Sequence, residues 1–326
     1  MTYTLKDVVL SRLVLKRRIF VALGVGGAAT AVASRYAPPL FSLPLLKDAA
    51  CSNPSSAASD APFRFVTAGD VGTGGKGQRR VADAMAAHWC ADPFQTVLLL
   101  GDNIYENGEI SRIAEVFEQP YAELLQKDVT FHAVLGNHDF RTRQGEDEIA
   151  YPGYNMPDRY YTFTKGPAQF FALDTNHFYL DSDRDREALW SSQRQWLKTE
   201  LERSPAQWKI VFAHHPIYSS GRHGTDRELA ASLSPLLEEY GVHLYINGHE
   251  HSYERTQPIN GTIYINAGNG GRSVRKVGES EWTEYAKSRL GFTTFDVYND
   301  RIVVKAIGTN GRTFDESLIP ATVAVS

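Results

Sequence analysis

Residues 96–105 read TVLLLGDNIY, a short β-branched and apolar run that leads directly into Gly101-Asp102. Its length suits a buried strand, and the glycine allows the backbone to turn sharply where the strand ends. The carboxylate of Asp102 then lies at the carboxyl edge of a sheet, where α/β proteins bind their ligands. The stretch therefore predicts a strand that presents an acidic side chain to a site.

Four further stretches repeat this arrangement in order along the chain. We expect strands at residues 63–68, 131–135, 209–213 and 243–246. Each is followed by carboxylate, amide or imidazole groups, in Gly69-Asp70, Gly136-Asn137-His138-Asp139, His214-His215-Pro216 and Asn247-Gly248-His249-Glu250-His251. One Gly-Asp after a strand is more often a turn than a ligand. Five such coincidences at one sheet edge favour a common site.

The last of these stretches carries two histidines at alternate positions. In an extended segment His249 and His251 would point to the same side, with Glu250 facing away. This spacing predicts that both imidazoles enter the same site.

The segments between the strands predict the fold class. Amphipathic stretches at residues 79–90, 113–126, 190–202 and 228–240 are expected to be helices, so the chain alternates strands and helices as an α/β fold does. Residues 262–266, 292–298 and 301–307 lie beside the turn signals Asn260-Gly261 and Asn299-Asp300. These last three segments predict antiparallel hairpin strands.

The first fifty residues differ from the rest in charge and hydropathy. They hold seven Lys and Arg but two Asp, so the remaining residues are near −9 although the whole chain is −4. Residues 19–33 are apolar, follow Lys16-Arg17-Arg18 and end in Ala31-Val32-Ala33, a small-residue cleavage site. Residues 1–33 are thus predicted to be an export signal or a membrane anchor.

The sequence Arg17-Arg18-Ile19-Phe20 is similar to the twin-arginine export signal. We expect a periplasmic or secreted protein, or a membrane-anchored one if the signal is uncleaved, with any membrane contact through residues 19–33 only. Residues 34–62 are expected to be a flexible linker, and residues 63–326 a single domain.

Composition excludes several classes of protein. Hydrophobic residues at 42% and charged residues at 22% exclude a disordered or coiled-coil chain. The acidic net charge predicts no nucleic-acid partner. Two cysteines cannot build a disulfide scaffold, and whether Cys51 and Cys90 pair is left open. Residues 72–77 lack the Ser or Thr that a phosphate loop needs after its Lys, and no serine nucleophile elbow is present.

The side chains at the five strand ends suit a particular kind of metal site. Carboxylate, amide, phenol and imidazole donors without thiolate favour iron, manganese or zinc. A site with two metals also needs a carboxylate that can bridge them.

The spacing of these groups resembles the five-block signature of calcineurin-like metallophosphoesterases. The blocks are Gly69-Asp70-x-Gly72, Gly101-Asp102-x-x-Tyr105, Gly136-Asn137-His138-Asp139, Val211-x-x-His214 and Gly248-His249-x-His251. The tyrosine three residues after Asp102, Tyr105, is similar to the pattern of the purple acid phosphatase branch. The resemblance to the family covers residues 63–307. The resemblance implies an α/β, four-layer αββα sandwich of two mixed β-sheets flanked by helices, with residues 63–326 as the catalytic domain.

The resemblance also implies the ligands of a binuclear centre. Ferric iron would be bound by Asp70, Tyr105 and His251, and a divalent Fe, Zn or Mn by Asn137, His214 and His249, with Asp102 bridging the two metals. The implied activity is that of an acid phosphatase, in which a metal-bound hydroxide attacks the phosphorus of a small phosphomonoester.

Three more histidines complete the implied site. His138 and His223 are placed to contact the substrate and to protonate the leaving group, as a histidine at the His223 spacing does in the small, tartrate-resistant type. His215 is expected to be a substrate contact in the pocket. The remaining four histidines are expected to be structural: His88, His132, His177 and His243.

Two alternatives remain open from the sequence. One is a phosphodiesterase or a nucleotidase that uses the same metals, since the pocket walls decide the ester type. The other alternative is a metal-binding protein without turnover. The subgroup is also open, because the Ser-Tyr-Glu-Arg sequence at residues 252–255 is similar to that of the large plant-type enzymes, whereas the chain is expected to have no room for their additional β-sandwich domain.

Overall fold

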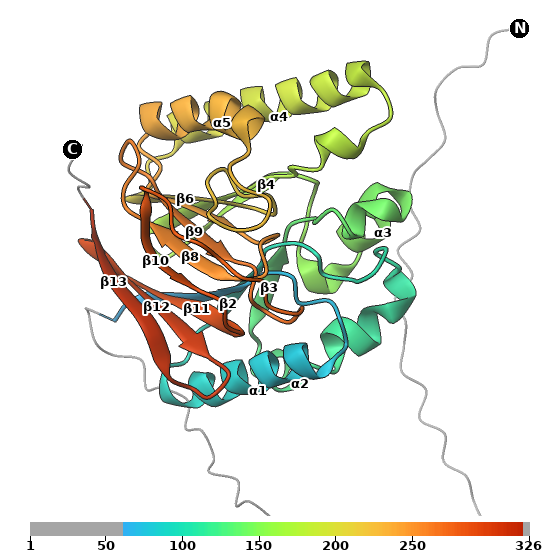
Figure 1. The fold of residues 1–326 in the computed structure, drawn as a ribbon, viewed down its shortest axis with the longest axis vertical. Coiled ribbons are helices and arrows are strands. Elements are labelled where there is room, and N and C mark those ends of the chain that lie inside the picture. Colours follow the sequence, from blue (N-terminus) through green and yellow to red (C-terminus); the bar gives the residue numbers. More distant parts are fainter. Residues whose placement is uncertain (1–60, 322–326) are drawn as a thin grey trace, which may run out of the picture. The chain divides into compact units, whose positions relative to one another are not determined.

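The computed structural model describes residues 61–321, which form two β-sheets packed against each other with helices on the outer faces (Figure 1). Phe65 of the first sheet meets Phe170 of the second edge-to-face, with ring centroids 5.1 Å apart. This apolar layer between the sheets is the main core. The expected four-layer αββα architecture is therefore confirmed.

The first sheet has six strands, and its parallel part carries three of the predicted strands. The strands are β1 (Phe63–Ala68), β2 (Thr96–Leu99), β3 (Thr130–Ala133), β11 (Gly291–Val297), β12 (Arg301–Gly308) and β13 (Thr313–Pro320), in the order β13-β12-β11-β1-β2-β3. β1, β2 and β3 run parallel, and β11 pairs antiparallel with β1. The carboxyl ends of β1, β2 and β3 consequently lie at one edge.

The second sheet has seven strands and contributes the other two predicted site loops. It contains β4 (Tyr161–Lys165), β5 (Ala168–Ala172), β6 (Trp208–Ala213), β7 (Leu244–Asn247), β8 (Tyr253–Thr256), β9 (Ile263–Ala267) and β10 (Thr283–Lys287), in the order β10-β8-β9-β7-β6-β5-β4. β5, β6, β7 and β9 run parallel. The loops after β6 and β7 therefore open on a shared edge.

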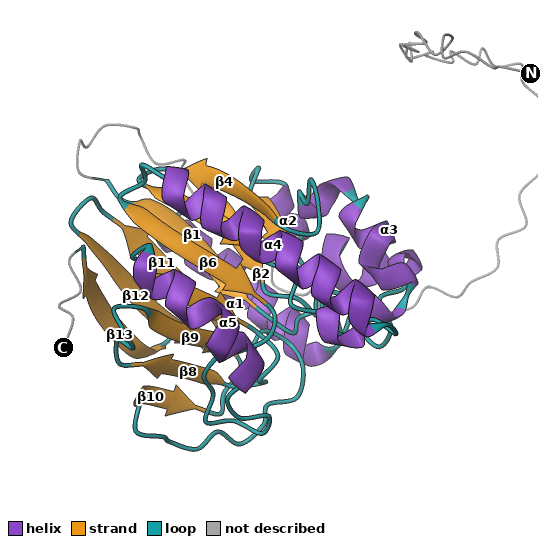
Figure 2. Ribbon diagram, turned by 90° about the horizontal axis from the view of Figure 1, so that it is seen from above, coloured by secondary structure: helices purple, strands orange, loops and turns teal. Residues whose placement is uncertain are grey.

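Two helices cover the outer face of the second sheet, as Figure 2 shows. They are α4 (Asp183–Arg203) and α5 (Arg227–Glu239), and their buried leucines pack on outward-facing residues of β6 and β7. Ser182 caps α4 by accepting from the Asp185 amide, and Asp226 caps α5 in the same way. On the other side α1 (Lys76–Ala91) buries Val81, Met85 and Trp89 against the first sheet, accompanied by the short α2 (Ala122–Leu125).

The helix expected at residues 113–126 is broken. A π-helical turn at Ala114–Glu118 is separated from α2 by Pro120, which lacks the backbone N–H that a continuous helix needs. Helix α4 begins at Asp183, seven residues before the predicted start at residue 190. The prediction missed its first two turns because they are charged and exposed and carry no apolar stripe. α3 (Glu146–Ile149) and several short 3₁₀ turns complete the fold.

Within residues 61–321, none of the helices is both long and apolar enough to cross a membrane. The predicted signal (residues 1–33), nearly all of the linker and Cys51 lie outside the described residues, as do residues 322–326.

Candidate metal centre

The seven predicted metal ligands meet where the carboxyl ends of the two parallel sheet regions face each other. Six of them form two groups of three, which we call the tyrosine group (Asp70, Tyr105 and His251) and the amide group (Asn137, His214 and His249). The seventh, Asp102, lies between the groups. The structure thus brings together residues that are up to 181 positions apart.

In the tyrosine group, three donor atoms are mutual neighbours. The Tyr105 hydroxyl lies 3.1 Å from Oδ1 of Asp70 and 3.3 Å from Nε2 of His251, and this nitrogen lies 3.3 Å from the same Asp70 oxygen. Nδ1 of His251 is 3.1 Å from the Ser273 carbonyl. Because a carbonyl can only accept, the proton belongs on Nδ1, and the Nε2 lone pair faces the group.

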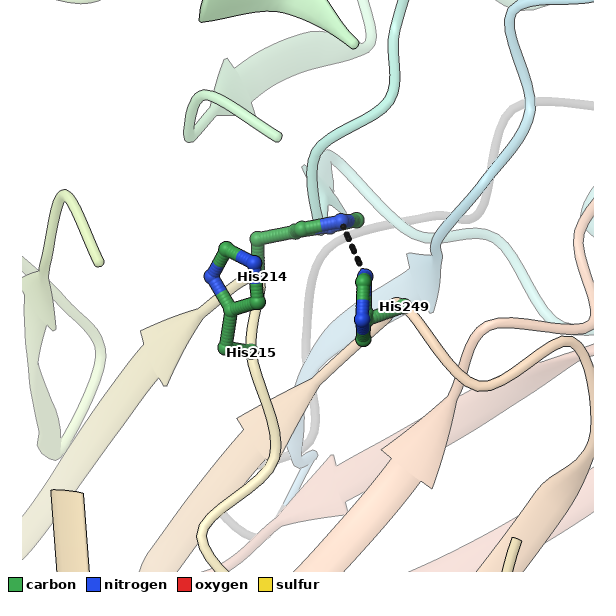
Figure 3. Close-up of side chains that lie close together, drawn as sticks. All are labelled: His214, His215 and His249. Atoms are coloured by element: carbon green, nitrogen blue, oxygen red, sulfur yellow. Dashed lines mark hydrogen bonds between the residues drawn. The ribbon is translucent and has the colours of Figure 1, made fainter. Parts of the chain in front are cut away.

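The amide group has the same compactness. Oδ1 of Asn137 lies 3.1 Å from Nε2 of His214 and 3.1 Å from Nδ1 of His249, and the two nitrogens are 3.1 Å apart. Figure 3 shows these two rings pointing toward each other beside His215. Nδ1 of His214 is 2.8 Å from the Leu100 carbonyl, which again leaves the Nε2 lone pair directed at the group.

Asp102 is placed to serve both groups. Its Oδ1 lies 3.4 Å from Nε2 of His214, and its carboxylate shares a cluster of ligand atoms, all within 4.8 Å of one another, with Asp70 and His214. Oδ1 also accepts from the His138 amide at 3.0 Å. A carboxylate in this position can contact a cation in either group.

Separations of 3.1–3.4 Å fit two metal ions. Ligands bonded to an ion at about 2.0–2.2 Å lie roughly 3 Å apart when they are neighbours on its coordination shell. The Nε2 lone pair of His214 lies 3.1 Å from Nδ1 of His249, and a cation bound between these two nitrogens and the Asn137 oxygen would use all three as ligands. The donor set therefore fits a binuclear centre.

The electrostatics of the tyrosine group also favour a cation. Burial, and then the charges of Asp70 and Asp102, raise the pKa of Tyr105 far above its usual value, so its phenol stays neutral unless a cation is bound. Burial alone would raise the pKa of Asp70, but the hydrogen bond and charge of His251 lower it overall. The carboxylate of Asp70 is thus ionised.

The backbone is strained at three of these positions. Asp70, Asp102 and His249 have φ values of 58°, 53° and 69°, in the left-handed region that non-glycine residues rarely occupy. Such strain costs about 1–3 kcal/mol per residue and concentrates at functional sites. Residues 249–252 form bends and not an extended segment, so the expected local geometry was wrong. His249 and His251 enter different groups.

Asp139 supports the loop that carries Asp102, a role that the sequence did not reveal. It is fully buried and accepts from the amides of Gly136 (2.8 Å), Asn103 (3.0 Å) and Ile104 (2.9 Å). Burial, and then the nearby Asp102, raise the pKa of Asp139 to about 7. Its carboxylate fastens the loop after β2 to the loop after β3.

The three additional histidines border the two groups. Nε2 of His138 lies 4.0 Å from Asp102, and its ring meets Tyr105 edge-on at 4.5 Å. The rings of His215 and His223 lie 4.6 and 4.3 Å from the His249 ring. His215 is buried and contacts Thr175 Oγ1 through Nδ1 at 2.7 Å, whereas the side chain of His223 is 38% exposed.

Glu250 is the second residue that sequence reasoning missed. Its Oε1 lies 2.9 Å from Nδ1 of His223 and accepts a hydrogen bond from the His223 amide. The carboxylate is buried, so it fixes this ring from behind. The only sequence signal was an acidic residue between two predicted ligands.

The chain is similar to known proteins in sequence and in fold. Residues 63–253 match the family described as calcineurin-like phosphoesterase. Purple acid phosphatase 7 of Arabidopsis thaliana is 31% identical over 246 residues, which cover 68% of this chain and 74% of the relative. Tartrate-resistant acid phosphatase type 5 of Mus musculus is 28% identical over 317 residues, or 85% and 94% of the two chains.

A solved structure described as GAP50, the anchor in the inner membrane complex of Plasmodium, shares the fold with a TM-score of 0.70 at 24% identity. The match covers 81% of this chain and 90% of that one. The family match contains every predicted ligand from Asp70 to His251, and the family implies a binuclear metal centre. The chain belongs to the calcineurin-like phosphoesterase family, in which its relatives include purple acid phosphatases.

Proposed function

We propose that this protein is a binuclear-metal acid phosphatase that hydrolyses small phosphomonoesters. The observation that carries the proposal is the pair of three-donor groups with Asp102 between them. Relatives named as acid phosphatases, two of them at 28–31% identity, support the same reaction.

The two groups differ in the metal that they would hold. The tyrosine group, with an anionic phenolate and carboxylate, suits ferric iron, and the amide group, with two imidazoles, suits divalent Fe, Zn or Mn. Asp102 would bridge them. When bound, the metals would activate water and neutralise charge on the phosphate oxygens.

The proton for the leaving group would come from histidine. With Nδ1 held by Glu250, Nε2 of His223 is the atom free to give a proton to the departing alkoxide. His138 is the second candidate, because its Nδ1 lies 2.6 Å from the Glu106 carbonyl and its Nε2 is directed toward Asp102. His215 would contact the substrate without charge, since burial, and then the charge of His214, lower its pKa well below the usual value.

Metal analysis combined with a visible spectrum tests the centre. The purified protein should contain iron and be violet to pink, and Tyr105→Phe should abolish the band, because the colour would arise from phenolate-to-ferric charge transfer. A colourless, iron-free but active enzyme would refute the iron assignment.

Comparing the hydrolysis of 4-nitrophenyl phosphate with that of the bis(4-nitrophenyl) diester tests the ester type. A strong diester preference would favour a phosphodiesterase instead.

We also propose export, with residues 1–33 as the signal, residues 34–62 as the linker and residues 63–326 as the catalytic domain. The support is the basic, apolar and small-residue order of the first 33 positions. Replacing Arg17 and Arg18 together by Lys should retain the protein inside the cell if the signal is of the twin-arginine type. Unchanged export of the double variant would exclude that route.

A further inference from the structure

Tyr179 is an exposed aromatic side chain beside the metal centre. Among residues 61–321, the large hydrophobic side chains that remain exposed are Tyr179 (50%), Val274 (41%) and Leu318 (59%). Tyr179 ends the 3₁₀ turn His177–Tyr179, in the loop between β5 and α4. Neither the proposed metal ligands nor the proposed proton donors give this ring a role.

The rings around Tyr179 connect it to the proposed leaving-group side of the site. Its centroid lies 6.0 Å from that of His215 and 6.5 Å from that of Phe140. The His215 ring is in turn 4.6 Å from His249, which His223 also borders. The His215 ring thus lies between Tyr179 and His249, and His249 in turn borders the proposed proton donor His223.

The chemistry of this surface suits an uncharged planar ring. The rings of Tyr179 and His215 are tilted by 32° to each other. Burial, and then the negative charge of Asp102, raise the pKa of Tyr179, so its phenol is neutral. Elsewhere the rim is charged, as where Arg272 pairs with Glu106. A phosphate dianion gains little from an aromatic face, whereas an aryl group stacks on it.

We propose that Tyr179, backed by His215 and Phe140, is a platform on which the leaving group stacks, so that the preferred substrates are aryl phosphomonoesters. The proposal rests on the proposed phosphatase activity. It assigns Tyr179 to selection among leaving groups and not to binding of the phosphoryl group.

Tyr179→Ala tests the platform with 2-naphthyl phosphate and glycerol 1-phosphate as substrates. The ratio of kcat/KM for the aryl ester to that for the alkyl ester should fall about fivefold or more, the size expected for loss of a stacked ring. Tyr179→Phe should keep the ratio, because the aromatic face remains. Leu318→Ala, which changes an exposed residue on the edge strand β13, is the matched control and should also keep it.

Two outcomes would overturn the proposal: an unchanged ratio in Tyr179→Ala, or an equal loss on both substrates, which would mean a structural role. If the wild type hydrolyses neither ester, the proposed phosphatase activity is wrong. The stacking role of Tyr179 is then tested by the binding of phosphonates. Phenylphosphonate should then bind the metal-loaded protein at least fivefold more tightly than methylphosphonate, and Tyr179→Ala should remove that preference. Equal binding of the two phosphonates by the wild type would refute the platform.

Discussion

Replacing Glu250 by Gln isolates the contact behind His223. The substitution keeps the size of the side chain but removes its charge from a hydrogen bond of 2.9 Å to Nδ1. A charge-assisted hydrogen bond contributes about 1.5–3 kcal/mol. Because the His223 side chain is 38% exposed, solvent weakens the contact, so we take the lower end of that range. About 1.5 kcal/mol corresponds to roughly a tenfold fall in kcat.

The assay compares two leaving groups in each variant. Phenyl phosphate has a poor leaving group that needs the proton, so Glu250→Gln should lose about tenfold in kcat on it. 4-Nitrophenyl phosphate leaves readily as the anion and should lose much less. Glu254→Gln is the matched control. Glu254 is also buried and also binds the loop that carries His223, since it accepts a hydrogen bond from the Ser220 amide at 2.8 Å. In the described part of the chain it contacts no histidine. It should not discriminate between the two substrates.

A double-mutant cycle can refute this reasoning. If Glu250 acts through the His223 ring, Glu250→Gln should have no further effect on kcat in a His223→Ala background. An undiminished tenfold loss in that background would show that Glu250 acts on the metals or on the fold. Equal losses on the two esters would contradict the proton-donor role itself.

Three further predictions follow from the packing and charges of the domain. Asp139→Ala leaves three buried amides of the two ligand loops unpaired, so the free energy of unfolding should fall by about 3 kcal/mol, measured by urea denaturation, with weaker metal binding. Burial lowers the pKa of His132 to about 4, below its unfolded value of 6.5; the unfolded chain therefore binds more protons between these values, and stability should fall as the pH drops through pH 6.5 to 4, by roughly 3 kcal/mol in total. His132→Phe, which keeps the ring stacked on Phe163, should flatten that pH dependence of unfolding, and an unchanged slope would contradict it. Removing the metals with a chelator should lower the Tm reversibly. If metal is normally present at 1,000 times its Kd, the free energy of unfolding should fall by about 4 kcal/mol. This loss should be smaller in Asp102→Ala, where one shared ligand is already missing.

The loops that carry the ligands were predictable because each follows a strand whose apolar run is unambiguous. β1 was expected at its observed bounds, and β6 and β7 within one residue of theirs. Of the four edge strands only β3 was predicted, whereas β4, β10 and β13 were not. β13, for example, carries charged residues and mixes exposed with buried side chains, so it has no apolar run. The break at Pro120 was visible in the sequence but was overridden by the surrounding amphipathic pattern.

The support around the ligands was less predictable, for a physical reason. The role of Asp139 depends on amide groups from another loop, and that of Glu250 on a histidine 27 residues earlier. Both contacts exist only once tertiary structure has formed. The left-handed backbone at Asp70 and Asp102 likewise runs against local preference, which predicts glycine there.

The pairing of β1 with β11 sets the order in which this domain can be completed during synthesis. Phe63 pairs with Val297, so the first strand gains its second neighbour only after the residues up to Val297 have left the ribosome. Until then β1 is an apolar edge strand, the kind of edge that recruits other chains. Truncation before Gly291 should therefore give aggregates in place of a smaller folded unit. Such long-range pairing also predicts slow folding and late metal uptake, since Asp70 is positioned by this strand.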